Sequence, residues 1–359
     1  MTVLISEKSD TLKESVRKIF ECFDKNIDYK RGFFLKPNIV FPVNGKSGEI
    51  TRPKVVRAVI EVLRERAGEA EIVIGEGTAA GTIPLENFRV SGFLNLSKQA
   101  HVPLLDLNGI ERIGVKWKYG VIDLPQVVFE RNYINLPILK MSSAAMISGA
   151  MKNQKGLVSV RMKKKFHKMG LHEPIAELAK IVQPRLTIMD GFNIFKKDVL
   201  IAGDNLYEID KAVVDLLGME EPEYLMLARQ YGLGGDDFRV LRGDLPRIRI
   251  RKKETEKYKK YLRIRLWSNP RACSMCRLNL INLKRIRLKN LDHAFSTYLK
   301  LLKHSIKGAE FVFGSYPKFS PSYEKVICIG TCTEKLAREN GYAHIPGCPP
   351  SEEDMVKYL

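Results

Sequence analysis

The stretches GFFLKPNIVF (32–41), RPKVVRAVIEVLRERAG (52–68) and EIVIGEGTAAG (71–81) decide the fold of this chain. The first and third are short apolar runs that end in Pro37-Asn38 and in a glycine-rich loop, as buried strands do. The middle stretch has apolar residues at helical spacing, a proline in its first turn and Gly68 as a stop signal. Strand, helix and strand in this order predict a βαβ unit with two parallel strands.

The same alternation continues along the chain and predicts an α/β fold. Strand-like runs and helical patterns follow each other up to about residue 243, which favours a mostly parallel sheet with flanking helices. A helix is also predicted near the start. The predicted strands are 133–139 and 184–191, and the predicted helices are 10–25, 172–182, 204–218 and 221–232.

Three segments are predicted: an α/β domain at 1–243, a strongly basic insert at 244–308, and a C-terminal cysteine segment at 309–359. In the insert, RIRIR (247–251) alternates like a strand, whereas 255–267 fits a helix or a strand equally well. A helix is expected at 291–308. The tail returns to α/β, with strands at 309–314 and 324–330 and a helix at 331–341. The final stretch AHIPGCPP (343–350) is predicted to be a short strand that runs into a rigid loop.

The positive charge is concentrated in one segment. The net charge of the chain is +19, and residues 247–307 carry 19 Lys or Arg against three acids. Aromatic residues such as Tyr258 and Trp267 lie among these charges, a pattern suited to RNA through phosphate contacts and base stacking. An acidic redox partner could bind the same surface instead. The remaining alternative is that the charges are only solvated and bind no partner.

The redox state of the cysteines follows from the expected compartment. The first 20 residues lack the basic and apolar regions of a signal peptide, and no run of 18 apolar residues predicts a transmembrane segment. We therefore expect a cytoplasmic protein, in which thiols stay reduced. This expectation favours metal binding over disulfides.

Five cysteines are candidate metal ligands. Cys273 and Cys276 have the Cys-x2-Cys spacing at which two thiolates meet one zinc ion or one iron–sulfur cluster. Cys332 is expected at the start of a helix, where a thiolate is favoured. Cys348 lies between a glycine and two prolines, which suits a rigid loop. Cys328 lies within a predicted strand, and core packing explains it as well as metal binding does.

The tail resembles a known cluster-binding segment. Residues GTCT (330–333) and IPGCPPSE (345–352) are similar to the cluster-binding end of the small subunits of nickel–iron hydrogenases and of the cluster-carrying subunit of respiratory complex I. The resemblance implies a [4Fe–4S] cluster ligated by Cys332 and Cys348. Cys273 and Cys276 would supply the other two ligands, although their spacing departs from that of the family. A four-cysteine zinc site is the alternative cofactor.

The α/β body contains candidate binding residues at or just beyond strand ends, where open α/β sheets bind ligands. A glycine-rich loop and several lysines suit the phosphate or carboxylate of an anionic small molecule. Lys36, Lys140 and His167 are the candidate catalytic acid–base residues, although a solvated surface charge is the alternative for each lysine. The candidate anion-binding residues are Gly75, Glu76, Gly77, Thr78, Lys152, Asn153 and Lys155.

Residues 32–243 resemble the family called domain of unknown function 362. The resemblance is carried by short pieces in a fixed order, among them LKPN (35–38), IGEG (74–77), INLP (134–137) and MKN (151–153). That family is thought to be distantly similar to lactate-racemase-like proteins. The family resemblance bears on the fold more than on the reaction. Taken with the cluster-binding resemblance of the tail and the candidate anion-binding residues, it leads us to expect an iron–sulfur protein that is an electron-transfer module or an enzyme acting on an anionic small molecule. A zinc-stabilised RNA-binding protein that uses the insert 247–307 is the alternative.

Overall fold

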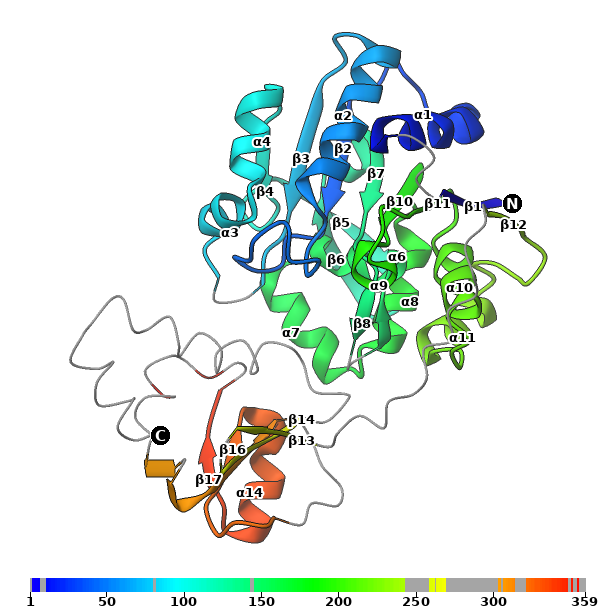
Figure 1. Cartoon of the computed structure of the whole chain (residues 1–359). Coiled ribbons are helices and arrows are strands. Elements are labelled where there is room, and N and C mark those ends of the chain that lie inside the picture. Colours follow the sequence, from blue (N-terminus) through cyan, green and yellow to red (C-terminus); the bar gives the residue numbers. More distant parts are fainter. Residues whose placement is uncertain are drawn as a thin grey trace. The chain divides into compact units, whose positions relative to one another are not determined.

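The structure is a computed structural model (Figure 1). It describes residues 2–6, 11–79, 82–142, 145–242, 258–261, 263–268, 303–304, 306–313, 321–347, 350 and 354. Contacts divide the chain into two compact units, Met1–Ile250 and Arg251–Leu359. Each unit is built on its own sheet.

An eight-stranded sheet with the order β12-β1-β11-β10-β7-β2-β3-β4 forms the centre of the first unit. The neighbours from β10 to β4 are all parallel, and only β11 runs antiparallel to both of its partners. The predicted α/β fold with a mostly parallel sheet is therefore confirmed. The strands are β1 (Thr2–Ser6), β2 (Phe33–Pro37), β3 (Ile72–Glu76), β4 (Leu104–Asp106), β7 (Asn132–Leu136), β10 (Leu186–Asp190), β11 (Leu200–Gly203) and β12 (Arg239–Arg242).

Helices cover both faces of this sheet (Figure 1). Side chains alternate between the faces along each strand, so Phe33 and Leu35 pack with the helices α1 and α2 while Phe34 packs on the opposite side. The helices are α1 (Leu12–Phe23), η1 (Asp24–Asn26), α2 (Pro53–Ala67), α3 (Pro84–Ser91), α4 (Phe93–Ala100), α5 (Val127–Glu130), α6 (Ala150–Asn153), η2 (Gln154–Leu157), α7 (Val160–Lys168), α8 (His172–Ile181), α9 (Phe192–Phe195), α10 (Leu206–Leu216) and α11 (Glu223–Gln230).

The βαβ unit forms as its residues predict. Strand β2, helix α2 and strand β3 follow one another, and β2 pairs with β3 in parallel. Helix α2 begins at Pro53 and ends at Gly68, whose φ of 56° is a conformation that a residue without a Cβ adopts readily. Two hairpins, β5 (Arg112–Trp117) with β6 (Gly120–Pro125) and β8 (Lys140–Ser142) with β9 (Met146–Ser148), lie outside the main sheet.

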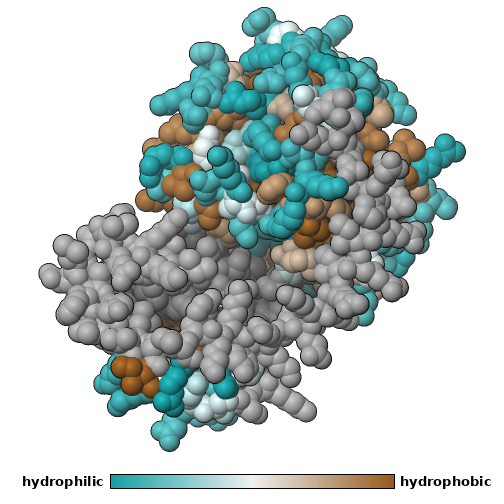
Figure 2. All heavy atoms as spheres, viewed as in Figure 1, coloured by the Kyte–Doolittle hydropathy of each residue, from teal (hydrophilic) through white to brown (hydrophobic). Residues whose placement is uncertain are grey.

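The surface of the first unit is mostly hydrophilic, as expected when the apolar side chains pack between the sheet and its helices. On the face shown in Figure 2, the described side chains of the first unit are mostly hydrophilic, with hydrophobic ones scattered among them. No helix among the described residues is long and apolar enough to cross a membrane.

The second unit has a five-stranded sheet with the order β13-β14-β15-β16-β17. Strands β14 to β17 are parallel, and β13 pairs antiparallel with β14. Segment 255–267, which fitted a helix or a strand, contributes two strands. The elements are β13 (Tyr258–Tyr261), β14 (Ile264–Ser268), β15 (Ala309–Phe313), β16 (Val326–Ile329), η3 (Thr331–Thr333), α14 (Glu334–Asn340) and β17 (Ala343–Ile345). The predicted strand 247–251 and most of the predicted helix 291–308 lie outside the described residues.

Candidate functional site

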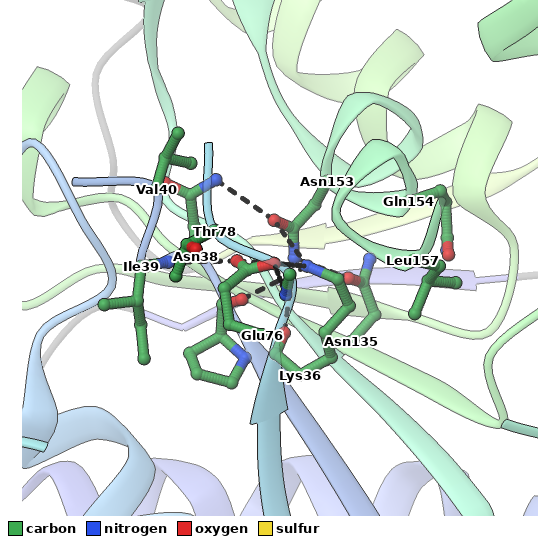
Figure 3. Close-up of polar contacts among 12 residues, drawn as sticks. Lys36, Asn38, Ile39, Val40, Glu76, Thr78, Asn135, Asn153, Gln154 and Leu157 are labelled. Carbon is green, nitrogen blue, oxygen red and sulfur yellow. Dashed lines mark hydrogen bonds and ion pairs between the residues drawn. The ribbon is translucent and has the colours of Figure 1, made fainter. Parts of the chain in front are cut away.

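The carboxyl ends of the parallel strands in the first unit meet in a buried polar network (Figure 3). Lys36 lies on β2 and Glu76 ends β3, and their side chains form an ion pair with the Lys36 amine 3.1 Å from Glu76 Oε1 and 3.2 Å from Oε2. Lys36 is 0% exposed, so burial lowers the pKa of its amine, and the Glu76 carboxylate acts against that decrease. The sequence predicts both residues at the carboxyl ends of strands, and the structure shows that their side chains form an ion pair with each other.

Backbone amides hold the Glu76 carboxylate in place. The Ile39 N–H donates to Oε2 at 3.0 Å and the Gly77 N–H donates to Oε1 at 2.8 Å. Together with the lysine, these donors satisfy both carboxylate oxygens. A buried charge needs such compensation, because removal from water is otherwise strongly unfavourable.

Asn153 joins this ion pair to the neighbouring strand and helix. Its Oδ1 accepts from the Lys36 amine at 3.3 Å and from Asn38 Nδ2 at 3.1 Å, and its Nδ2 donates to Asn135 Oδ1 at 2.8 Å. Asn135 pairs with Lys36 across β7 and β2. The predicted anion-binding residue Asn153 is therefore almost fully occupied by protein partners in this structure.

Two glycines let the backbone approach the ion pair closely. A Cβ at Gly156 would lie 2.1 Å from Glu76 Oε1 and 2.5 Å from the Lys36 amine, and a Cβ at Gly77 would lie 2.2 Å from the Gly156 carbonyl oxygen. Both positions exclude any larger side chain without movement of the backbone. The loop after β3 and η2 are thus packed directly on each other.

Lys163 on α7 reaches the same loop. Its amine donates to the carbonyl oxygens of Gly77 at 2.7 Å and Thr78 at 3.0 Å. Burial lowers the pKa of Lys163 to about 8, and Glu76 opposes that decrease. Sequence reasoning missed this residue because it lies in the run KKK (163–165), which looks like solvated charge; its spacing of three from buried Phe166 was the available signal.

Lys140 and Lys152 form a second polar group at this edge. The Lys140 amine donates to the Glu49 carbonyl oxygen at 2.5 Å and lies 3.9 Å from the Glu49 carboxylate, and Lys152 donates to Ser142 Oγ at 2.5 Å. Burial lowers the pKa of both amines. For Lys152 the pKa is about 8, and the positive charge of Lys140 contributes to the decrease.

Asp210 on α10 anchors the short helix that carries Lys152 and Asn153. Its carboxylate accepts from the N–H groups of Ala150 at 2.6 Å and Met151 at 3.1 Å, and from the Tyr224 hydroxyl at 3.2 Å. Burial raises the pKa of Asp210 to about 6, although these hydrogen bonds act in the other direction. The helical pattern of 204–218 gave no sign that this acid points into the protein.

The remaining predicted residues of the first unit are placed less completely. Gly75 lies within β3, Thr78 is buried and Lys155 lies partly exposed in η2. His167 lies on α7, but its side chain is outside the described residues, so its predicted catalytic role stays a prediction.

In the second unit the described cysteines differ in environment. Cys328 on β16 is buried against Val312, Val326 and Ala337. Burial is the main cause that raises the pKa of its thiol to about 11, and the nearby Cys332 thiol adds to the increase. Cys332 lies exposed in η3.

The loop of Cys332 is bonded to the segment that leads to Cys348. The Gly330 N–H donates to the Ile345 carbonyl at 2.8 Å, and the Thr331 N–H donates to that of Gly347 at 2.9 Å. Cys273, Cys276 and Cys348 lie outside the described residues, as does most of the insert 247–307. Within the described ranges, no three His, Cys, Asp or Glu side chains gather as metal ligands would.

Two comparisons relate this chain to known proteins, and the family match lies within the first unit. The family model of Domain of unknown function (DUF362) matches residues 34–215, which are about half of the chain. The thylakoid-associated protein sll1697 of Synechocystis sp. is 26% identical over 220 residues, which are 56% of this chain and 67% of that protein. The family match contains the Lys36–Glu76 pair, Lys140, Lys152 and Asp210.

Proposed function

This chain belongs to the family Domain of unknown function (DUF362), and we propose that it is an iron–sulfur protein of two working parts. The second unit holds a [4Fe–4S] cluster, and the first unit binds an anionic small molecule at the carboxyl edge of its sheet. Bound in this way, the cluster would supply one-electron redox chemistry. The protein would then be an electron-transfer module or an enzyme acting on that molecule.

The strand order of the second unit carries the proposal. Strands β14, β16 and β17 are parallel members of one sheet, so their carboxyl ends share one edge. The chain leaves β14 at Ser268 five positions before Cys273, enters η3 with Cys332 directly after β16, and leaves β17 at Ile345 three positions before Cys348. All the cysteine segments of the proposed ligand set therefore start from the same edge.

The described cysteines favour one ligand set over another. Cys332 is exposed at that edge, and its loop is hydrogen-bonded to residues 345–347. Cys328 points into a small apolar core on the strand itself. We therefore propose Cys273, Cys276, Cys332 and Cys348 as ligands and assign Cys328 to packing.

Zinc bound by the same four cysteines is the rival cofactor, because Cys-x2-Cys serves both. Analysis of iron, sulfide and zinc in the full chain purified without oxygen separates the two. We expect about four iron and four sulfide per chain, as four thiolates bind them, with absorbance at about 400 nm. One zinc and no iron would overturn the cluster and leave a structural metal site.

The anionic ligand is supported by the charge at the sheet edge of the first unit. Four lysine amines, those of Lys36, Lys140, Lys152 and Lys163, lie in or beside the polar residues there, while Glu76 and Glu49 are the carboxylates that face them within ion-pair distance. An excess of positive charge beyond strand ends suits a phosphate or carboxylate. Absence of any anion binding by the full chain would remove this part of the proposal.

The basic insert favours a second candidate function, RNA binding by a zinc-stabilised protein. The observation behind it is the 19 Lys or Arg against three acids in residues 247–307. Binding to single-stranded RNA should then weaken steeply with salt. Because the Synechocystis relative is named thylakoid-associated, anionic lipid vesicles make a useful competitor. No RNA binding at low salt would exclude this candidate.

A further inference from the structure

Lys140 and Lys152 are brought together by a hairpin that the sequence did not predict. Lys140 and Ser142 are two positions apart on β8, so their side chains leave the same face of the strand, about 7 Å apart at the Cβ atoms. Lys152 reaches this face from α6 and donates to the Ser142 hydroxyl. Two amines twelve positions apart in the sequence are thus held on one side of the hairpin.

The charges of this group are not balanced. Lys140 has the Glu49 carboxylate at 3.9 Å, and the Glu49 side chain is 57% exposed to solvent. Lys152 forms no ion pair with any carboxylate of the described ranges. Its amine donates to the neutral Ser142 hydroxyl, and the positive charge of Lys140 acts on it. Two like charges held together with one exposed carboxylate beside Lys140 are only partly compensated, and a bound anion would neutralise the remaining positive charge.

The other two lysines of this edge differ in that respect. The Lys36 amine is fully buried and bonded to Glu76, Pro37 and Asn153. The Lys163 amine is occupied by two carbonyl oxygens of the loop after β3. The Lys36 amine therefore has a partner for each of its three N–H donors, and the Lys163 amine has partners for two of its three. Lys140 and Lys152, in contrast, are only partly buried and keep donor N–H groups to spare.

We propose that Lys140, Lys152 and the Ser142 hydroxyl form the subsite that binds the carboxylate or phosphate group of the anionic molecule. This inference rests on the proposed function of the first unit and makes it specific. Each ammonium group donates to one oxygen of the anion, and the Ser142 hydroxyl helps to position the Lys152 amine by accepting from it. Charged hydrogen bonds of this kind are stronger than neutral ones, and two ammonium groups side by side favour an anion with two or more oxygens.

Titration calorimetry of the full-length chain at low ionic strength tests the subsite, with inorganic phosphate and malonate as the two probes. We expect the wild-type chain to bind at least one probe, and the stronger binder identifies the group. Lys140→Met and Lys152→Met should each weaken binding about tenfold or more, as loss of a charged hydrogen bond does. Lys98→Met, at an exposed lysine of the same unit, is the matched control and should bind as the wild type does.

The pH dependence provides a measurement that needs no variant. Among the described residues, the charged groups that face Lys152 and Lys140 from the packed elements are the two amines themselves and Glu49. Malonate stays fully ionised from about pH 7 to about pH 9.5, so its affinity should fall as Lys152 loses its proton near its pKa of about 8. Affinity that is constant over this range would overturn the subsite even if a methionine variant failed to fold.

The outcomes separate this inference from the broader proposal. If the wild-type chain binds a probe and both methionine variants bind it equally well, the anion lies elsewhere and only the subsite is overturned. If the wild-type chain binds neither probe, both the subsite and the anionic ligand of the first unit are overturned.

Discussion

The buried ion pair between Lys36 and Glu76 should be strongly cooperative, and a double-mutant cycle measures this. Lys36→Met leaves the Glu76 carboxylate buried, although the Ile39 and Gly77 N–H groups still bond to it. Loss of one partner of a buried pair costs about 3–5 kcal/mol in the free energy of unfolding, and the two remaining donors place this variant near about 3 kcal/mol. Glu76→Gln should cost at least as much, because its new amide N–H group faces an N–H donor.

The double variant Lys36→Met/Glu76→Gln leaves neither charge unpaired. Its loss of unfolding free energy should be smaller than the sum of the two single losses by more than about 1 kcal/mol. Urea unfolding followed by the fluorescence of Trp117, which is buried in the first unit, gives these values in a Trp267→Phe background. If the loss of unfolding free energy in the double variant equals the sum of the two single losses, the Lys36–Glu76 ion pair does not stabilise the carboxyl end of this sheet as we infer.

Three further predictions concern the same unit. Gly156→Ala should destabilise it by about 1–3 kcal/mol, because the new methyl group meets Glu76 and Lys36, whereas Gly235→Ala, with no atom within 4 Å, should be nearly neutral in urea unfolding. Lys152 has its pKa lowered to about 8, so the unfolded chain binds more protons above that pH; stability should rise between about pH 8 and about pH 10.5, and less so in Lys152→Met. Asp210 has its pKa raised to about 6, so the folded chain binds more protons, and wild-type stability relative to Asp210→Asn should fall as the pH rises from about 4 to about 6. Equal pH profiles for wild type and variant would contradict either assignment.

The sequence predicts the parts of the fold that depend on local patterns. Apolar runs and a helix with clear start and stop signals identify β2, α2 and β3, and the strand ends then locate Lys36 and Glu76 at one edge. Strands β1, β11 and β12 were not predicted. They join the sheet through pairing between distant segments, and β1 lies between them although it begins at residue 2. Local periodicity carries little information on such pairing.

The partners within the site also depend on distant contacts. The ion pair joins positions 36 and 76, Asn153 arrives from a third element, and Asp210 fixes that element from a fourth. No local pattern marks Lys163 or Ser142 as members of this edge, since both residue types are common at surfaces. In the second unit, the spacing of the cysteines in the sequence does not show that their segments start from one place. The parallel order of β14, β16 and β17 supplies this information, because the segments then follow strand ends at a common edge of the sheet.

The measurement that tests the account most directly is the iron and sulfide content of matched cysteine variants of the full chain, purified without oxygen. Cys332→Ala should lose the cluster. Cys22→Ala, at an exposed cysteine of α1, and Cys328→Ala, at a buried one, should keep about four iron and four sulfide per chain. Full cluster content in Cys332→Ala, or loss in Cys328→Ala alone, would contradict the proposed ligand set.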